Sequence, residues 1–234
     1  MHTPPLSARE LEHRILFERD GLIAVDKPWG LPSTGRHLQD RDCLQFALMQ
    51  RHAEMVWAVH QLDADTTGIN LFVRTKALVP HWQQRMRYPS GTKTYLAIVH
   101  GRAEFDERRI DAPIGVVTEQ PVRQLGIRAD GQRAVSEVHV LGRGDESSLL
   151  RVRIETGRTH QIRIHLSSIG HPLFGEDWYR EPRCVAHQRQ ALHAWRLEFA
   201  DEDEPRVIEC PLPDDLLRLM ESLELPGALP VADQ

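Results

Sequence analysis

The sequence contains little cysteine and little lysine, and it has no long apolar run. Only Cys43, Cys184 and Cys210 occur among its 234 residues, and they form neither a CxxC pair nor a disulfide framework, which is typical of a reducing compartment. We expect all three to be buried as small apolar side chains. No stretch approaches the ~20 continuous apolar residues that a membrane-spanning helix requires, and the amino terminus lacks a secretory signal. These absences predict a cytoplasmic protein with no membrane partner.

The acidic residues are unevenly distributed along the chain, which has a net charge of -5. Residues 198–234 hold two arginines against eleven Asp and Glu, a balance of -9; residues 1–197 therefore carry 27 basic against 23 acidic residues, a balance of +4. Arginine makes up 26 of the 29 basic residues, and its planar fork suits phosphate contact and stacking on bases. A genomic preference for arginine codons explains that ratio equally well. Composition therefore permits an RNA partner without requiring one.

The pattern of apolar and turn residues predicts many strands with irregularly placed helices. Regular βαβ alternation is missing, so we predict an α+β fold with a mixed, largely antiparallel sheet and flanking helices. No linker is long enough to separate independent domains, and no internal repeat is present. We predict an N-terminal extension (1–19), one main domain (20–213), and an acidic C-terminal helix and tail (214–234).

The individual elements follow from alternation, helical spacing and turn signals. A hairpin with an Asp20-Gly21 turn opens the fold, and Asp42 is the expected cap of the first long helix. A Pro/Gly-punctuated stretch from 111 to 131 has no assigned element. We expect strands at 14–18, 22–27, 56–62, 68–75, 93–101, 134–142, 148–157, 191–200 and 206–211, and helices at 42–54, 76–86, within 157–170 and at 214–224.

Four polar clusters lie at the ends of predicted strands or in turns, where functional groups are often held by a rigid scaffold. They are "DKPWGLPSTG" (26–35), "HQLDADTTG" (60–68), "KTYLAIVHGR" (93–102) and "GRTHQIRIHLSSIGHPLFGE" (157–176). Together they resemble the RluA-type family of RNA pseudouridine synthases. The family's "HRLDxxTSG", "GRTHQIRxH", "GHPxxGD", "DKPxGL" and "KxY" segments all have counterparts here, in the expected order, and five ordered motifs are far more specific than one.

The resemblance implies a sheet divided by a catalytic cleft, with residues 20–213 as the catalytic domain. It implies that uridine in structured RNA, either tRNA or rRNA, is isomerised to pseudouridine without a cofactor. It places the catalytic aspartate at Asp63, the arginine that pairs with it at Arg163, and an aromatic residue of the site at Tyr95. We expect seven further residues to contact the RNA: His60, Gln61, Thr66, Thr67, Lys93, Arg158 and His160.

The chemistry of the reaction supports a carboxylate at this position. Breaking the N1–C1′ bond and joining C5 to C1′ needs a group that can attack an electron-poor carbon or stabilise a charged anomeric centre, as carboxylates do in glycosidases. Asp63 directly follows an apolar strand, whereas Asp65 is better explained as a turn former. Which carbon Asp63 attacks, or whether it acts first as a base, stays open.

The reaction also requires a cation beside the carboxylate and a flat surface for the uracil, which an arginine and a tyrosine can supply. A carboxylate in a desolvated cleft tends to take up a proton, and an adjacent cation keeps it ionised. We predict that Arg163→Met leaves a folded protein with severely reduced turnover. Tyr95 offers a flat surface for a uracil removed from its stack, although strand alternation alone would also place it in the core. Lys93 and Arg158 have structural interpretations as well.

Neither a metal nor a nucleotide cofactor is expected. Thirteen histidines occur, but His160 and His165 are five residues apart, whereas the zinc pattern HExxH uses i and i+4. No cysteine lies close by in sequence, and His187 with His193 has no supporting motif. The glycine-containing segments match neither the P-loop nor the GxGxxG fingerprint.

One departure from the family pattern opens an alternative. Gln61 replaces the usual arginine after the motif histidine, which raises the possibility of a protein that binds RNA without catalysis. A glycoside or nucleoside hydrolase would need a second acid, for which Asp65 and Glu155 are the nearest candidates.

The central segment supplies candidate phosphate contacts, and the analogy indicates a monomer. The arginines concerned are Arg102, Arg108, Arg109, Arg123, Arg128 and Arg133.

Overall fold

The computed structural model describes residues 6–37, 39–120, 122–179, 187–201 and 204–227. The chain forms two compact units: unit 1 comprises Met1–Lys93 and His193–Pro211, and unit 2 comprises Thr94–Leu192 and Leu212–Gln234. Each unit is described by itself below. Among the described residues, no helix has both the length and the apolar character to cross a membrane.

Unit 1 begins with a short helix and the predicted hairpin. Helix α1 (Ala8–Glu12) is followed by β1 (Ile15–Arg19) and β2 (Leu22–Lys27), which pair antiparallel. Asp20 and Gly21 both have positive φ angles of 51° and 77°, as a tight turn between two strands requires. The predicted hairpin is confirmed, and β1, inside the predicted N-terminal extension, belongs to the sheet.

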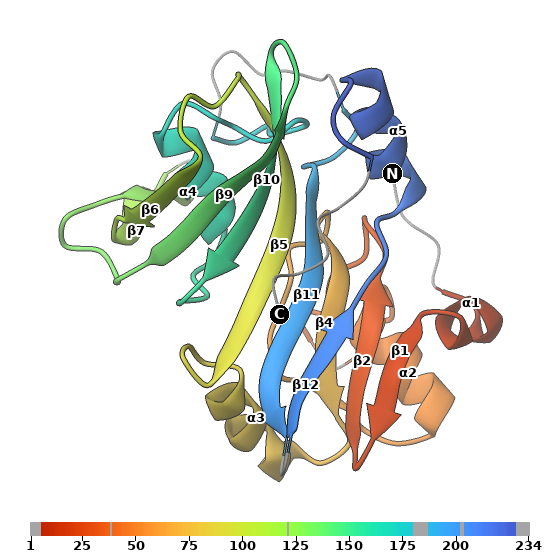
Figure 1. Ribbon diagram of the computed structural model, residues 1–234. Helices are drawn as coiled ribbons and strands as arrows, with labels where there is room; N and C mark the ends of the chain where they lie inside the picture. Colours follow the sequence, from red (N-terminus) through yellow and green to blue (C-terminus); the bar gives the residue numbers. More distant parts are fainter. Residues whose placement is uncertain (1–5, 38, 121, 180–186, 202–203, 228–234) are drawn as a thin grey trace. The chain divides into compact units, whose positions relative to one another are not determined.

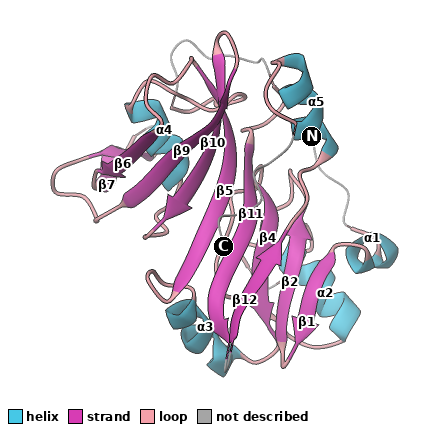
Figure 2. Cartoon of the chain, viewed as in Figure 1, coloured by secondary structure: helices cyan, strands magenta, loops and turns pink. Residues whose placement is uncertain are grey.

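The sheet of unit 1 has the order β1-β2-β4-β11, with β3 beside β4 and β12 beside β11 (Figures 1 and 2). These strands are β3 (Trp57–Ala58), β4 (Thr67–Val73), β11 (Leu192–Asp201) and β12 (Glu204–Glu209). β4 is antiparallel to β2 and parallel to β11, where Thr67 lies opposite His193. Gly68 is needed at this crossing, because its φ is 102° and an added Cβ would lie 2.3 Å from the Ala194 carbonyl oxygen.

Both faces of this sheet are buried. Leu22 and Ala24 of β2 belong to one apolar cluster, and Ile23 and Val25 belong to another, as the alternation of side chains in a strand dictates. The second cluster includes residues of α2 (Leu44–His52). The N-cap of α2 is Cys43, which makes no side-chain cap bond. The prediction of Asp42 as the cap is therefore wrong by one residue.

The predicted helix at 76–86 is present as a 3-10 turn, η1 (Lys76–Leu78), followed by α3 (Val79–Arg85). Trp82 and Met86 of this region pack into the first cluster. Cys43 and Cys210 are buried, as expected, whereas Cys184 lies outside the described residues.

Unit 2 contains a sheet of order β5-β10-β9-β6 (Figure 1). Its strands are β5 (Gly91–His100), whose first three residues belong to unit 1, β6 (Glu107–Asp111), β9 (Val135–Arg143) and β10 (Ser147–Ile154). β9 pairs antiparallel with both β6 and β10. Among the described strand pairs whose direction is given above, β4–β11 is parallel and the others are antiparallel, so the predicted α+β fold with a mixed, largely antiparallel sheet is confirmed.

The stretch from 111 to 131 contains an element that the sequence did not predict. β7 (Ile114–Thr118) and β8 (Gln124–Ile127) form a separate two-stranded hairpin. Helix α4 (Gln161–Ser168) carries the "QIRIH" part of the fourth polar cluster (157–176), and α5 (Asp214–Ser222) packs Leu216 and Met220 into an apolar cluster with Leu149 of β10.

Candidate active site

Asp63 lies in the loop between β3 and β4 of unit 1. The Thr66 amide donates to the Asp63 carbonyl oxygen at 3.0 Å, which closes a turn around Ala64 and Asp65. Asp63 is half-buried and Asp65 is exposed. The backbone of the predicted catalytic residue is thus fixed, while its side chain is not sealed in the interior.

Lys27, at the end of β2, holds this loop through hydrogen bonds to backbone carbonyl oxygens. Its ammonium group donates to the carbonyl oxygens of Ala64 at 2.7 Å, Leu31 at 2.7 Å and Pro28 at 2.9 Å. The residue is fully buried, and a buried cation is tolerated only where hydrogen bonds replace its water. The first motif therefore supports the loop that carries Asp63.

Ser33 anchors the residue on the other side of Asp63. Its hydroxyl accepts from the Leu62 amide at 2.9 Å and donates to the Leu62 carbonyl at 3.2 Å. The exposed Gln61 amide donates to the Thr34 hydroxyl at 3.0 Å. Sequence reasoning named Gln61 but missed Lys27 and Ser33; the "DKPWGLPSTG" cluster contained the signal, without indicating which backbone groups its side chains would bind.

His60 is a neutral part of this scaffold. The Leu71 amide donates to its Nε2 at 3.3 Å, and the Asn70 side chain donates to its carbonyl oxygen at 2.9 Å. Burial, and then the Lys93 cation, lower the pKa of His60 to about 3. Burial also lowers the pKa of Lys93. The contact of either residue with RNA stays a prediction.

The hydroxyl of Thr67 points to a histidine of the neighbouring strand. Its Oγ1 lies 2.9 Å from Nδ1 of His193, whose Nε2 lies 3.1 Å from the Cys210 carbonyl oxygen. Because a carbonyl only accepts, Nε2 carries the proton and the Thr67 hydroxyl donates to Nδ1. Thr66 and Thr67 are both buried; their predicted contact with RNA is not tested.

Arg163, on α4 of unit 2, forms a buried ion pair that the sequence did not reveal. Its Nε donates to Oε2 of Glu176 at 2.8 Å, and its Nη2 donates to Oε1 at 2.7 Å. A second carboxylate, that of Asp177, lies 3.5 Å from Nη2. Arg163 is 6% exposed and Glu176 0%. Such a two-pronged pair fixes the plane of the guanidinium group.

Glu176 also fixes the residues that follow it. Its Oε1 accepts from the amides of Trp178 at 3.0 Å and Tyr179 at 3.3 Å. Burial alone would raise the pKa of Glu176, but the hydrogen bonds and charge of Arg163, together with the two amides, hold it below its usual value. The replacement of the family's aspartate by Glu176 therefore retains an ionised carboxylate here.

Aromatic side chains surround this ion pair. The guanidinium carbon of Arg163 lies 5.3 Å from the ring centroid of Tyr179 and 5.8 Å from that of Trp178. His160 Nδ1 lies 2.7 Å from the Tyr179 hydroxyl, and the His160 ring meets Trp178 edge-on at 5.5 Å between centroids. His160 is the N-cap of α4 in a left-handed conformation.

Gln161 and His165 of "GRTHQIRIH" have structural roles. Gln161 accepts from the Thr156 hydroxyl and the Arg158 amide, and donates to Val135 and Ser136. His165 is fully buried, with Nδ1 2.9 Å from the Ser136 hydroxyl and Nε2 3.0 Å from a carbonyl oxygen. These bonds give His165 a hydrogen-bonding role in the core.

A pocket of about 430 Å³ opens beside His160 in unit 2. The β7–β8 hairpin forms one side of it. The lining also includes Arg158, Trp178 and Tyr179. Of the predicted site residues, Arg158 and His160 thus come together here; Trp178 and Tyr179 were not predicted.

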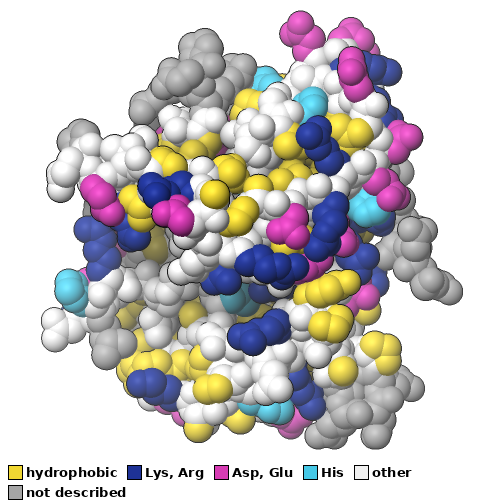
Figure 3. Space-filling view, turned by 90° about the vertical axis from the view of Figure 1, so that its left-hand side faces the viewer, with side chains coloured by type: hydrophobic (Ala, Val, Ile, Leu, Met, Phe, Trp, Pro, Cys, Tyr) yellow, Lys and Arg dark blue, Asp and Glu magenta, His cyan; other side chains and the backbone are white. Residues whose placement is uncertain are grey.

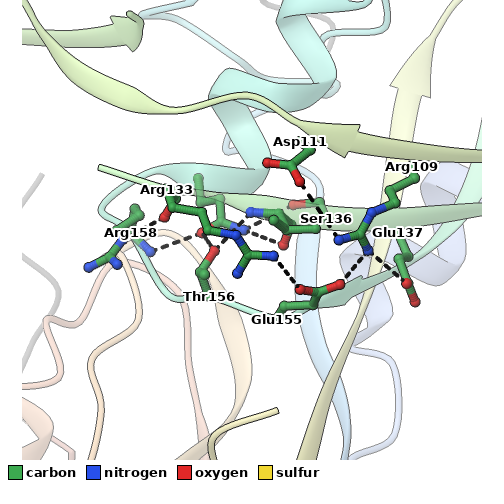
Figure 4. A network of polar contacts seen from close by, with 10 residues as sticks. Arg109, Asp111, Arg133, Ser136, Glu137, Glu155, Thr156 and Arg158 are labelled. Carbon is green, nitrogen blue, oxygen red and sulfur yellow. Dashed lines mark hydrogen bonds and ion pairs between the residues drawn. The ribbon is translucent and has the colours of Figure 1, made fainter. Parts of the chain in front are cut away.

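Three of the six central arginines, Arg109, Arg128 and Arg133, pair with carboxylates, and Figure 4 shows Arg109 and Arg133. Glu155 pairs with Arg109, and with Arg133 at 3.0 Å, while Arg128 holds Asp130 through two bonds of 2.7 Å. Figure 3 shows the same mixture on one face, where basic side chains lie among acidic ones.

The hydrogen bond from Arg109 lowers the pKa of Glu155 more than burial raises it. The bond from Arg133 lowers it further, so the pKa of Glu155 lies below its usual value. An acid that gives up its proton this readily is a poor proton donor near neutral pH. The geometry therefore disfavours Glu155 as the second acid of a hydrolase.

Tyr95 lies on β5 in unit 2 and is 7% exposed. This burial fits both a packed strand residue and the wall of a recess. Asp63 belongs to unit 1 and Arg163 to unit 2, so their pairing stays a prediction.

Comparisons by family model, by sequence and by structure all match this chain to RNA pseudouridine synthases. A family model described as RNA pseudouridylate synthase matches residues 21–168. Ribosomal large subunit pseudouridine synthase D of Nitrosomonas europaea is 35% identical, covering 92% of this chain and 67% of that protein. The uncharacterized RNA pseudouridine synthase YlyB of Bacillus subtilis is 33% identical, covering 94% and 76%. The structure of human RNA Pseudouridylate Synthase Domain Containing 1 has a TM-score of 0.74 at 26% identity, covering 99% of this chain and 100% of that one.

Proposed function

Because the chain belongs to the RluA-type family of RNA pseudouridine synthases and is thereby an isomerase, we propose that it converts a specific uridine of structured RNA to pseudouridine, with Asp63 as the catalytic carboxylate. The observation that carries this proposal is the loop of Asp63. Ser33 and Lys27 fix the backbone of its neighbours Leu62 and Ala64, while Asp63 itself is only partly buried. Such an arrangement holds a reactive group in place without burying it.

The reaction breaks the bond between N1 and C1′ and forms a bond between C5 and C1′, so C5 loses its hydrogen to solvent as a proton and N1 takes up a proton. Asp63 supports this exchange either by a transient covalent bond or by stabilising the charged sugar. Arg163, as the cationic partner, keeps the carboxylate ionised. Tyr95 supplies the surface on which the detached uracil turns.

The RNA is proposed from the names of the relatives. Several of them act on the large ribosomal subunit, among them the Nitrosomonas europaea protein at 35% identity and the Pseudomonas aeruginosa protein at 34%. Others, such as the Vibrio vulnificus protein at 31%, are named as dual-specificity enzymes. Ribosomal RNA is therefore the first substrate to test, and tRNA the second.

To test this proposal, the purified protein is incubated with total RNA from cells that lack it. Pseudouridine is then mapped in that RNA. We expect new marks with the wild-type chain and with Asp65→Asn, and none with Asp63→Asn. Asp65 is a matched control because it is a carboxylate of the same loop that is exposed. Release of free uracil would indicate hydrolysis instead, and RNA binding with no new mark from any variant would refute the proposed activity.

A further inference from the structure

The pocket beside His160 has a composition that the reaction at Asp63 does not explain. Its apolar lining comes from the β7–β8 hairpin: Ile114, Val116 and Leu125. Its volume of about 430 Å³ is within the range of small-molecule sites, roughly 300–1,000 Å³. Tyr95, the predicted surface for the reacting uracil, does not line it.

Trp178 is the most unusual residue of this lining. It is 47% exposed, yet it is held in place by its amide bond to Glu176 and by the edge contact with His160. Val117, Val122 and Ile127 of the neighbouring hairpin region are also exposed. An exposed apolar group of this kind that is rigidly mounted is typical of a binding surface.

The charged residues at the pocket are mainly basic. Arg123 and Arg158 line it and are exposed. Asp130 is the acidic residue of the lining, and Arg128 neutralises it through both carboxylate oxygens. A flat aromatic surface beside available cations suits a ligand that is planar at one end and anionic at the other, which describes a nucleotide within an RNA strand.

We propose that this pocket binds an unpaired base of the RNA, distinct from the uridine that is isomerised, stacked on Trp178 with its phosphate near Arg158 and Arg123. The inference rests on the proposed function, since it names a second contact of the same substrate. Recognition of a base outside the reacting one gives the enzyme a means of selecting among uridines. Neither charge nor shape favours an acidic or purely apolar partner here.

The bonds of Glu176 allow base binding at Trp178 to be tested separately from the reaction. Its Oε1 accepts from Arg163 and from the Trp178 amide, so this hydrogen bond to residue 178 does not depend on the indole ring. Replacing the indole removes the stacking surface and leaves the bonds of Glu176 and Arg163 in place. A change at Trp178 should therefore weaken RNA binding and raise KM, with little effect on kcat.

The test measures fluorescence anisotropy of a labelled single-stranded RNA hexamer and of a blunt RNA duplex with the full-length protein. Trp178→Leu should weaken binding of the single strand by about tenfold, because the substitution removes the aromatic ring on which a base stacks. Trp178→Phe should retain most of the affinity. Leu217→Ala is the matched control, because Leu217 is a comparably exposed apolar residue (43%) on α5.

The outcomes separate this proposal from the proposed function. Unchanged affinity in Trp178→Leu, or equal weakening for the duplex and the single strand, would overturn the base pocket even if pseudouridine still forms. Conversely, Asp63→Asn should bind the hexamer like the wild-type chain. Loss of hexamer binding in Trp178→Leu and its retention in Asp63→Asn would support the pocket whether or not the wild-type chain isomerises uridine.

Discussion

The two predicted catalytic groups are held in opposite ways. Asp63 is fixed through its neighbours: Lys27 and Ser33 bind the backbone of Ala64 and Leu62, and the carboxylate stays half-exposed. Arg163 is fixed through its own charge, by a buried two-pronged bond to Glu176. The comparison teaches that the loop of Asp63 depends on the side chains of Lys27 and Ser33, whereas the Arg163 side chain itself holds part of unit 2 together. The roles of Asp63 and Arg163 in the reaction stay predictions.

Replacement of Arg163 should cause the largest loss of stability and turnover. A small loss would contradict the difference that we draw between Arg163 and Asp63. Arg163→Met leaves the carboxylate of Glu176 buried and unpaired, which costs about 3–5 kcal/mol. The sequence led us to expect a folded variant with severely reduced turnover; the buried ion pair adds the expectation that this variant is less stable than the parent. Urea unfolding should show that loss, and RNA turnover should fall as well.

A second substitution distinguishes the two roles of Arg163. In Arg163→Met with Glu176→Met, the unpaired charge is gone, so part of the lost stability should return while turnover stays low. Recovery of turnover in the double variant would contradict a role for the guanidinium group in the reaction.

Lys27 tests the support of the Asp63 loop. Lys27→Met removes the donor from three carbonyl oxygens and should lower the free energy of unfolding by about 2–4 kcal/mol, with a partial loss of turnover. Lys76→Met is the matched control, because Lys76 is exposed and contacts the Trp57 ring at 4.9 Å. Equal thermal unfolding of the two variants would contradict the support that we assign to Lys27.

Acidification should destabilise the Asp63 scaffold before it affects Glu176. Since burial lowers the folded pKa of His60 from 6.5 to about 3, its contribution to stability is present above pH 6.5 and is lost as the pH falls toward 3. Between pH 6.5 and 4.5 this amounts to roughly 2–3 kcal/mol. The folded pKa of Glu176 lies below 4.5, so its contribution is lost only below pH 4.5.

The substitution His60→Gln provides the readout for this prediction. Burial also lowers the pKa values of His52 and His165, so the total pH dependence has several sources. Urea unfolding of His60→Gln should show a flatter profile between pH 6.5 and 4.5 than the wild-type chain. Identical profiles would show that His60 is protonated without cost.

The smallest effect concerns two arginines near the pocket. Arg123 is exposed at the lining, whereas the charge of Arg128 is neutralised by Asp130. Arg123→Gln should reduce the salt dependence of RNA affinity by about one unit of slope, and Arg128→Gln by much less. A larger change for Arg128→Gln would mean that its pair with Asp130 opens on binding.

Sequence patterns predicted β1, β2, β4, β5 and β9 to β12 close to their observed bounds, because alternation is a local property. The strand expected at 56–62 is present only as β3 (Trp57–Ala58), so Asp63 does not directly follow a strand, and β6 (Glu107–Asp111) was not expected. Alternation and turn residues defined β1 and β2, and the β3–β4 loop was expected from its motif. The β7–β8 hairpin was missed, since its glycines and short strands are typical of irregular loops as well.

The supports of the site were harder to predict, because they join residues far apart in the chain. Lys27 binds Ala64 across 37 residues, and Thr67 meets His193 across 126. Arg163 and Glu176 both stood in recognised motifs, but spacing alone does not show that their side chains meet. Sequence identified the residue types, and only the fold showed which of them hold the others.

The central claim is that this chain joins C5 of uridine to C1′ with the help of Asp63, and the most direct measurement is tritium release from RNA labelled at C5 of uridine. Because the new carbon–carbon bond displaces the hydrogen at C5, the wild-type chain and Asp65→Asn should release tritium to water, and Asp63→Asn should release none while remaining folded. Release by Asp63→Asn at the wild-type rate would contradict the account.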